Sequence, residues 1–221
     1  ICVYFLASSP TARAASRTYL ARALERPATL ADIYRHFHTF ATVALDRFYF
    51  LTGRFEKFDV RIDGEALLRE ALEAGGGCFL IGAHLGSFEA LRTLGRGRHV
   101  PVKLVMYEDN ARKIIAVAKA LDPELADSVI ALGRFDSMLR VAESLDRGEW
   151  LGVLGDRALD DSGCIGVPFF GERAPFPSAP LRMAAMLKRP VILMVALFRG
   201  GNRYDLHFEP LLTMDDLARR D

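Results

Sequence analysis

The sequence predicts one α/β domain with a mainly parallel central sheet flanked by helices, preceded by an N-terminal pair of helices. Its 221 residues suffice for one domain with a full core and are few for two. From Phe58 onward, short apolar runs alternate with longer amphipathic segments, as in βαβ units. Residues 10–52 carry helix signals instead. We therefore expect a helical segment, 1–55, followed by one α/β unit, 56–221.

The helical segment contains two expected helices. Pro10 and Thr11 begin the first, which ends at Pro27, and Thr29 begins the second, which runs toward Gly53. Arginines at near-helical spacing give the first helix either a basic face toward anionic headgroups or a plain solvated face: Arg13, Arg17, Arg22 and Arg26. Aromatics on the second helix either line an apolar groove or pack in the core: Phe37, Phe40, Phe48, Tyr49 and Phe50.

The α/β unit is expected to alternate strands and helices. The expected strands are 58–62, 78–82, 102–106, 129–132, 151–154, 191–198 and 204–209. The expected helices are 65–73, 88–94, 111–121, 136–146 and 179–187. In a parallel sheet the carboxyl ends of the strands meet at one edge, and ligands of open α/β sheets bind there.

Composition excludes several classes of function. A formal net charge of +1 offers no field for a polyanion, so nucleic acid is not an expected partner. Neither Cys2, Cys78 and Cys164 nor the histidines have metal-ligand spacing, so we expect no disulfide framework and no metal site. Cys78 is expected to be a core thiol.

The N-terminal run ICVYFL is too short to span a membrane. We expect the chain to be a fragment with a truncated C-terminus.

The segment GGGCFLIGAHLGSFEALR holds the candidate catalytic residues. An apolar strand ends before His84, and a glycine-containing turn then leads into a helix, so His84 is expected at the ligand-binding edge. From the first helical turn, Glu89 is expected to fold back onto Nδ1 of His84 and to fix its tautomer. Nε2 is then free to deprotonate an alcohol that attacks a carbonyl. Taken separately, a turn histidine and a helix-start acid are the structural alternatives.

Two blocks of the sequence are similar to one enzyme family. GAHLGSFE resembles the His-x4-acid motif of the glycerolipid and lipid A acyltransferase superfamily, and its Glu resembles the lipid A late acyltransferase branch. GDRALDDSGCIGVPFFGERAPFPSAPLRMA resembles that branch's acidic and polar turn, its PFFG and its proline-containing segment before a helix. The similarity spans Phe58 to Leu211 and implies a glycerolipid acyltransferase-like fold. The sequence departs from the lipid A enzymes in GAHLGSFEALR and in its single GDR, and it most resembles a smaller bacterial group of predicted acyltransferases.

The second block adds candidate substrate-binding residues. Asp156 and Arg157 follow an expected strand at the same edge as His84. Arg157 is expected either to hold a phosphate or the thioester oxygen, or to pair with Asp156 or Asp160. Phe169 and Phe170 are expected either to line an acyl chain, beside a rigid proline-rich wall, or to pack in the core.

Other strand ends supply further candidates for substrate binding. Arg134 follows the strand 129–132, and the resemblance implies that it binds phosphopantetheine or an acceptor phosphate. Asp136 is expected to cap the next helix. Tyr107 and Asn110 follow the strand 102–106 and are candidates by position alone.

The resemblance implies a membrane-associated acyltransferase that moves a fatty acyl group from a thioester to a hydroxyl of a lipid or glycolipid. Acyl carrier protein or CoA would carry the acyl group as co-substrate, and no cofactor would be needed. Segment 1–55 would be membrane-proximal. The enzyme would work at the cytoplasmic face of a bacterial inner membrane.

Two other functions are open on the sequence alone. Ser87 in LGSFE suggests a serine esterase or thioesterase, although Glu89 stands where the motif G-x-S-x-G requires glycine. A non-catalytic lipid-binding module would use the same apolar groove without chemistry. The esterase predicts an acyl group on Ser87, whereas the binding module predicts that replacing His84 has no effect.

Overall fold

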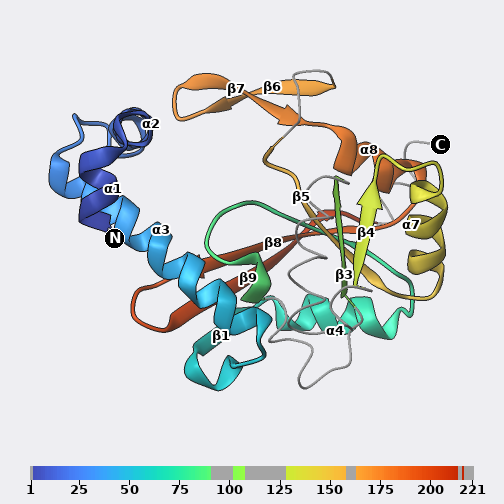
Figure 1. Ribbon diagram of the computed structural model, residues 1–221. Helices are drawn as coiled ribbons and strands as arrows, with labels where there is room; N and C mark the ends of the chain where they lie inside the picture. Colours follow the sequence, from blue (N-terminus) through green and yellow to red (C-terminus); the bar gives the residue numbers. More distant parts are fainter. Residues whose placement is uncertain (1, 91–101, 108–127, 158–162, 214–215, 217–221) are drawn as a thin grey trace.

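Seven strands form the central sheet of the computed structural model, which describes residues 2–90, 102–107, 128–157, 163–213 and 216 (Figure 1). The strands lie in the order β1-β9-β8-β2-β5-β3-β4. Their bounds are β1 Asp59–Asp63, β2 Phe79–Gly82, β3 Val102–Tyr107, β4 Val129–Leu132, β5 Trp150–Leu154, β8 Val191–Phe198 and β9 Arg203–Leu212. Neighbouring strands are parallel except β8 with β9. The predicted mainly parallel α/β fold is confirmed.

Helices precede the sheet and cover it. They are α1 Cys2–Ser8, α2 Pro10–Ala23, α3 Leu30–Leu51, the 3₁₀ turn η1 Phe55–Lys57, α4 Glu65–Glu73, α7 Ser137–Asp146 and α8 Ala179–Met186. The expected N-terminal pair is present as α2 and α3, whereas α1 was not expected. Of the expected helix 88–94, residues 88–90 form a 3₁₀ turn and the rest lie outside the described residues, as does the expected helix 111–121.

A two-stranded hairpin, β6 Cys164–Phe169 and β7 Glu172–Pro177, lies apart from the sheet and was not predicted (Figure 1). Its strands contain Pro168 and Pro175, which remove backbone donors and obscure a strand pattern. Positive φ angles at Phe170 (49°) and Gly171 (80°) make the two-residue turn that suits a twisted hairpin. The segment expected to be a rigid wall is therefore a hairpin whose tip carries Phe169 and Phe170.

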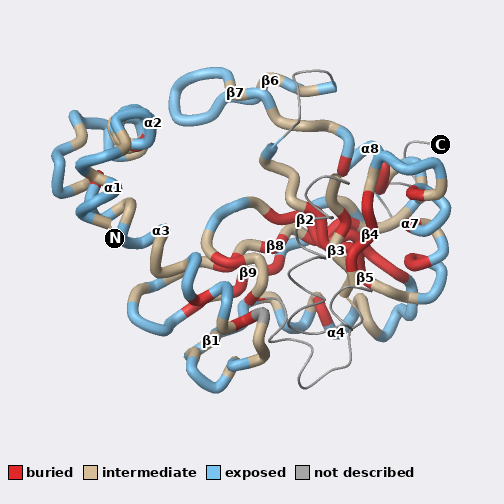
Figure 2. Tube along the Cα trace, in the orientation of Figure 1, coloured by how far each residue is buried: buried red, intermediate tan, exposed pale blue. Residues whose placement is uncertain are grey.

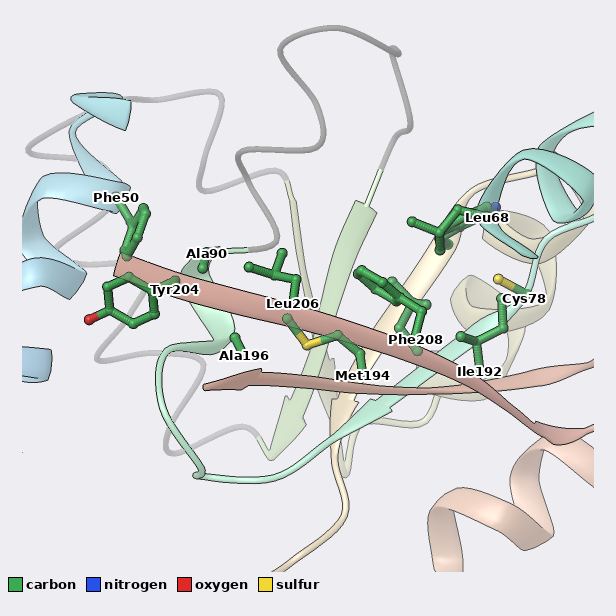
Figure 3. Packing of buried hydrophobic residues seen from close by; sticks show 12 residues of the cluster. Phe50, Leu68, Cys78, Ala90, Ile192, Met194, Ala196, Tyr204, Leu206 and Phe208 are labelled. Atoms are coloured by element: carbon green, nitrogen blue, oxygen red, sulfur yellow. The ribbon is translucent and has the colours of Figure 1, made fainter. Parts of the chain in front are cut away.

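Both faces of the sheet are buried, and Figure 2 shows the buried positions gathered along its central strands. In β2, Phe79 and Ile81 belong to one core cluster and Leu80 to the other, because successive side chains point to opposite faces. One cluster includes Leu68 of α4, and the other includes residues of α7 and α8. Figure 3 shows the first cluster along β8 and β9. Burial on both faces explains why β2 reads as a continuous apolar run.

Helix α3 begins at a capping box and ends against the sheet. The Thr29 hydroxyl accepts from the Asp32 N–H at 3.2 Å, and the Asp32 carboxylate accepts from the Thr29 N–H at 2.9 Å. At the other end, the Phe50 ring stacks on Phe58, with centroids 4.3 Å apart, and meets Tyr204 of β9 edge-on. The aromatics of α3 divide, since Phe50 is core whereas Phe40 is 74% exposed.

The arginines of α2 do not form an uninterrupted basic face. Arg22 pairs with Glu172 at 2.7 Å, and Arg26 pairs with Asp32 at 2.8 Å. The Arg13 guanidinium donates to the carbonyl of Leu6. The contacts of Arg22 and Arg13 tie α2 to the hairpin and to α1, whereas Arg26 lies just after α2 and ties that connection to α3. Among the described residues, no helix has the length and apolarity needed to cross a membrane.

Candidate active site

His84 and Asp156 form the centre of the site. Strand β2 pairs with β5 in parallel, so the residues that follow these strands meet at one edge. Nδ1 of His84 lies 2.9 Å from Oδ1 of Asp156, and the backbone N–H of His84 donates to Oδ2 at 3.1 Å. A carboxylate oxygen accepts, so Nδ1 carries the proton and Nε2 is left as an acceptor. The His84 side chain is 41% exposed, so Nε2 is within reach of a substrate.

The predicted contact between Glu89 and Nδ1 of His84 is wrong. Asp156 occupies that position, and Glu89 pairs instead with Arg47 of α3, whose Nε lies 2.5 Å from Oε1. The sequence predicted that Asp156 lies at the same edge of the sheet as His84, but as a residue that binds substrate. The reason is topological, because the adjacency of β2 and β5 sets the partner of His84 across 72 positions of sequence. A catalytic role for Glu89 stays a prediction.

The turn after His84 is fastened to strand β8. Ser87 donates its backbone N–H to the carbonyl of Ala196 at 3.1 Å, and Gly86 forms a parallel bridge with the same residue. Gly86 has φ +72°, and a Cβ built on it would lie 1.5 Å from the Ala196 oxygen. No side chain fits at that position. Beyond the turn, the Phe88 ring lies against Gly82 of β2 and Gly152 of β5.

Replacing Gly86 with alanine is expected to lower the free energy of unfolding by about 2 kcal/mol or more, because the Cβ would collide with backbone. Gly133→Ala is the matched control, since Gly133 also has a positive φ (+98°) but has no atom within 4 Å of the built Cβ. That control should cost about 1 kcal/mol. Urea denaturation measures both variants, and equal losses would contradict the role given to the Ala196 contact.

The site and the fold agree with a comparison against known protein families. The profile of the bacterial lipid A biosynthesis acyltransferases matches residues 30–220, which include the sheet, His84 and Asp156. The chain belongs to this family. A search of curated proteins finds no significant match. The sequence resemblance is thereby confirmed, and the protein is a lipid acyltransferase in the general sense.

An apolar cleft of about 280 Å³ opens beside the His84–Asp156 pair of this acyltransferase. Its inner end is formed by Ile81 of β2 and by Gly155, the residue before Asp156. The hairpin and α8 supply the walls, including Val167, Phe169 and Leu181. An apolar cleft with a few polar groups at one end is the usual form of a small-molecule binding site.

The two aromatic residues at the hairpin tip of the acyltransferase, Phe169 and Phe170, face different parts of the molecule. Phe169 lines the cleft, and its expected contact with an acyl chain stays a prediction. Phe170 faces α2 instead, where its ring meets Tyr19 edge-on with centroids 6.0 Å apart. The Arg22–Glu172 ion pair lies at the same contact. The hairpin therefore extends from α8 to the N-terminal helices.

The remaining candidates of the acyltransferase lie at different distances from His84. Arg157 directly follows Asp156 and is exposed, and within the described part of the chain it has no ion pair. In the sheet, β3 is the second strand from β2 and β4 is the third. From the spacing of neighbouring strands, Tyr107 lies about 10 Å and Arg134 about 14 Å from His84 along the edge. Asn110 lies outside the described residues.

Arg134 is held locally in the acyltransferase. Its Nε lies 3.5 Å from Oδ1 of Asp136, and its backbone N–H donates to the Ser137 hydroxyl. Asp136 stands at the N-cap of α7 but makes no side-chain cap hydrogen bond, so its expected capping contact is wrong. Ser137 satisfies the turn instead, donating to the Ala131 carbonyl at 2.8 Å. Substrate binding by Arg134 stays a prediction.

Cys78 is a core thiol, as expected. It is 1% exposed, and burial raises the pKa of the thiol to about 12, so it is not a nucleophile near neutral pH. Within the described residues, no cluster of three or more His, Cys, Asp or Glu side chains is arranged to hold a metal ion.

Sequence reasoning missed Arg47, the partner of Glu89, because Arg47 lies on a helix in which no motif marks it.

Proposed function

We propose that the protein transfers a fatty acyl group from a thioester of acyl carrier protein or CoA to a hydroxyl of a lipid or glycolipid. The observation that carries this proposal is the His84–Asp156 pair, which leaves Nε2 free at the ligand-binding edge. The apolar cleft beside the pair suits the acyl chain. Family membership supports acyl transfer to a lipid in general.

In the proposed reaction, Nε2 of His84 removes the proton of the acceptor hydroxyl as its oxygen attacks the thioester carbonyl. The new C–O bond forms, the C–S bond breaks, and the imidazolium returns its proton to the departing thiolate. Asp156 stabilises the imidazolium through Nδ1, at 2.9 Å. Arg157 or backbone amides would stabilise the oxyanion. The products are an ester and a free thiol, with no metal required.

The proposed place of work is the membrane surface, at the cytoplasmic face of a bacterial inner membrane. Exposed apolar side chains on α1 favour contact with lipid, since Val3, Tyr4 and Phe5 are 68%, 70% and 53% exposed. Segment 1–55 would then be the membrane-proximal part of the chain. The acceptor is also a membrane lipid in this proposal, so donor and acceptor would meet at the interface.

The test is an incubation of the purified protein with palmitoyl thioester of acyl carrier protein or CoA, with and without vesicles of bacterial lipid extract. Thiol release should require the vesicles, and mass spectrometry should find a new ester in the lipid. Release of free fatty acid without acceptor, abolished in Ser87→Ala, would establish the esterase alternative. Thioester or lipid binding without thiol release would establish the lipid-binding alternative.

Filling the cleft should change the preferred acyl length. Leu181 lines the cleft from α8, so Leu181→Trp is expected to lower kcat/KM for a long-chain thioester about tenfold relative to a short-chain one. Leu139→Trp is the matched control, because Leu139 lies on α7 and is 62% exposed. Competition between C16 and C10 thioesters measures the ratio. An unchanged ratio in Leu181→Trp would place the acyl chain elsewhere.

A further inference from the structure

The C-terminal half of α3 is joined to the sheet by a buried polar contact. Asp46 is 8% exposed and Tyr204 of β9 is fully buried. The Tyr204 hydroxyl donates to Oδ2 of Asp46 at 2.8 Å. Burial raises the pKa of Asp46. A buried pair of this kind has one favourable geometry, so it fixes the rotation of α3 against the sheet.

The next residue of α3 reaches the catalytic turn. Nε of Arg47 lies 2.5 Å from Oε1 of Glu89, and Ser87 donates its hydroxyl to Oε2 at 3.3 Å. The Glu89 side chain is only 11% exposed, whereas Arg47 is 49% exposed. The pKa of Tyr204 is raised first by burial, then by the hydrogen bond to Asp46 and the charge of Asp46, and then by the charge of Glu89. Glu89 therefore lies near the Asp46–Tyr204 pair. Helix, turn and sheet therefore meet at one polar cluster, formed by Asp46, Arg47, Ser87, Glu89 and Tyr204.

Charge balance explains why Glu89 needs Arg47. A carboxylate that is largely removed from water is costly unless an opposite charge and hydrogen bonds compensate it. Asp156 has His84 as its partner, and Glu89 has Arg47 and Ser87. Without Arg47, the Glu89 carboxylate would be driven toward water. The turn that carries Ser87 and His84 would move with it.

We propose that Arg47 is a positioning residue, which holds Glu89 and thereby fixes the turn 84–90 for acyl transfer. The kinetic part of this inference rests on the proposed function. Arg47 touches no reacting atom, so its effect passes through Glu89 and the turn. The N-terminal helices are then part of the catalytic unit, because the fixed rotation of α3 sets the place of the Arg47 side chain.

The test compares Arg47→Ala, Arg47→Lys, Glu89→Gln and the double variant Arg47→Ala/Glu89→Gln. Arg35→Ala is the matched control, an exposed arginine on the same helix. Arg47→Ala should lower kcat about 10–100-fold with little change in KM for the thioester. Arg47→Lys should restore part of the loss. Because both residues act as one unit, the double variant should be no slower than the slower single variant.

Hydrogen exchange gives a readout that does not depend on activity. The backbone N–H groups of His84, Ser87 and Ala90 are all hydrogen-bonded, so their exchange reports the order of the turn. Exchange in peptides covering 79–90 should rise in Arg47→Ala and stay at the parental rate in Arg35→Ala. Faster exchange would support the positioning role even if the parent protein transferred no acyl group, an outcome that would sink only the proposed function. Unchanged exchange, or additive kinetic losses in the double variant, would overturn the role of Arg47.

Discussion

Replacement of His84 by alanine is expected to lower the rate of acyl transfer by about 10³-fold or more, because the reaction loses its general base. Nε2 is the free nitrogen of the pair, since Nδ1 faces Asp156 at 2.9 Å. The variant should remain folded, because His84 is 41% exposed and lies outside the core clusters. Thiol release from the acyl thioester, measured with lipid acceptor present, checks the prediction.

His38→Ala serves as the matched control for His84→Ala. His38 is an exposed histidine on α3, remote in sequence from the strand-end turn. Its loss should leave the rate within about twofold of the parent. Circular dichroism and the thermal midpoint establish that both variants fold. A His84→Ala protein that is folded and still transfers acyl groups at the parental rate would refute the mechanism and return attention to Ser87.

Replacement of Asp156 by asparagine is expected to lower kcat by about 10³-fold, through the tautomer of His84. Oδ2 of Asp156 accepts the His84 backbone N–H, and Oδ1 faces Nδ1. An asparagine that keeps the first contact turns its NH₂ group toward Nδ1, which must then accept. The imidazole proton moves to Nε2, where a base is needed. Alanine at position 156 does not impose the wrong tautomer on His84, so Asp156→Ala should be no slower than Asp156→Asn.

The comparison of Asp156→Asn with Glu89→Gln distinguishes the two carboxylates. Glu89 contacts Arg47 and Ser87, so its amide variant should cost only about tenfold in kcat, as expected for a positioning contact. Asp156→Asn should be the slower by about two orders of magnitude. The measurement is kcat for each variant at saturating thioester. If Glu89→Gln is instead the slower of the two, Glu89 is the partner of His84 during the reaction.

Local sequence signals located the strand-end histidine and the elements around it. Strands β4 and β8 begin and end where expected, at Val129–Leu132 and Val191–Phe198, because both are apolar runs bounded by polar residues, glycine or proline. Helix α4 is also as expected, at Glu65–Glu73. The hairpin β6–β7 was missed, since its prolines and exposed side chains lack the alternation by which a half-buried strand is recognised.

The sequence by itself determined the fold class, the family resemblance and the place of His84 and Asp156 at one edge of the sheet. These depend on periodicity and on strand direction, which are written in neighbouring residues. Only the tertiary structure decided that Asp156 holds His84 and that Arg47 holds Glu89. The physical reason is that strand order and helix docking bring together residues 72 positions apart in the first pair, and no local spacing encodes that proximity.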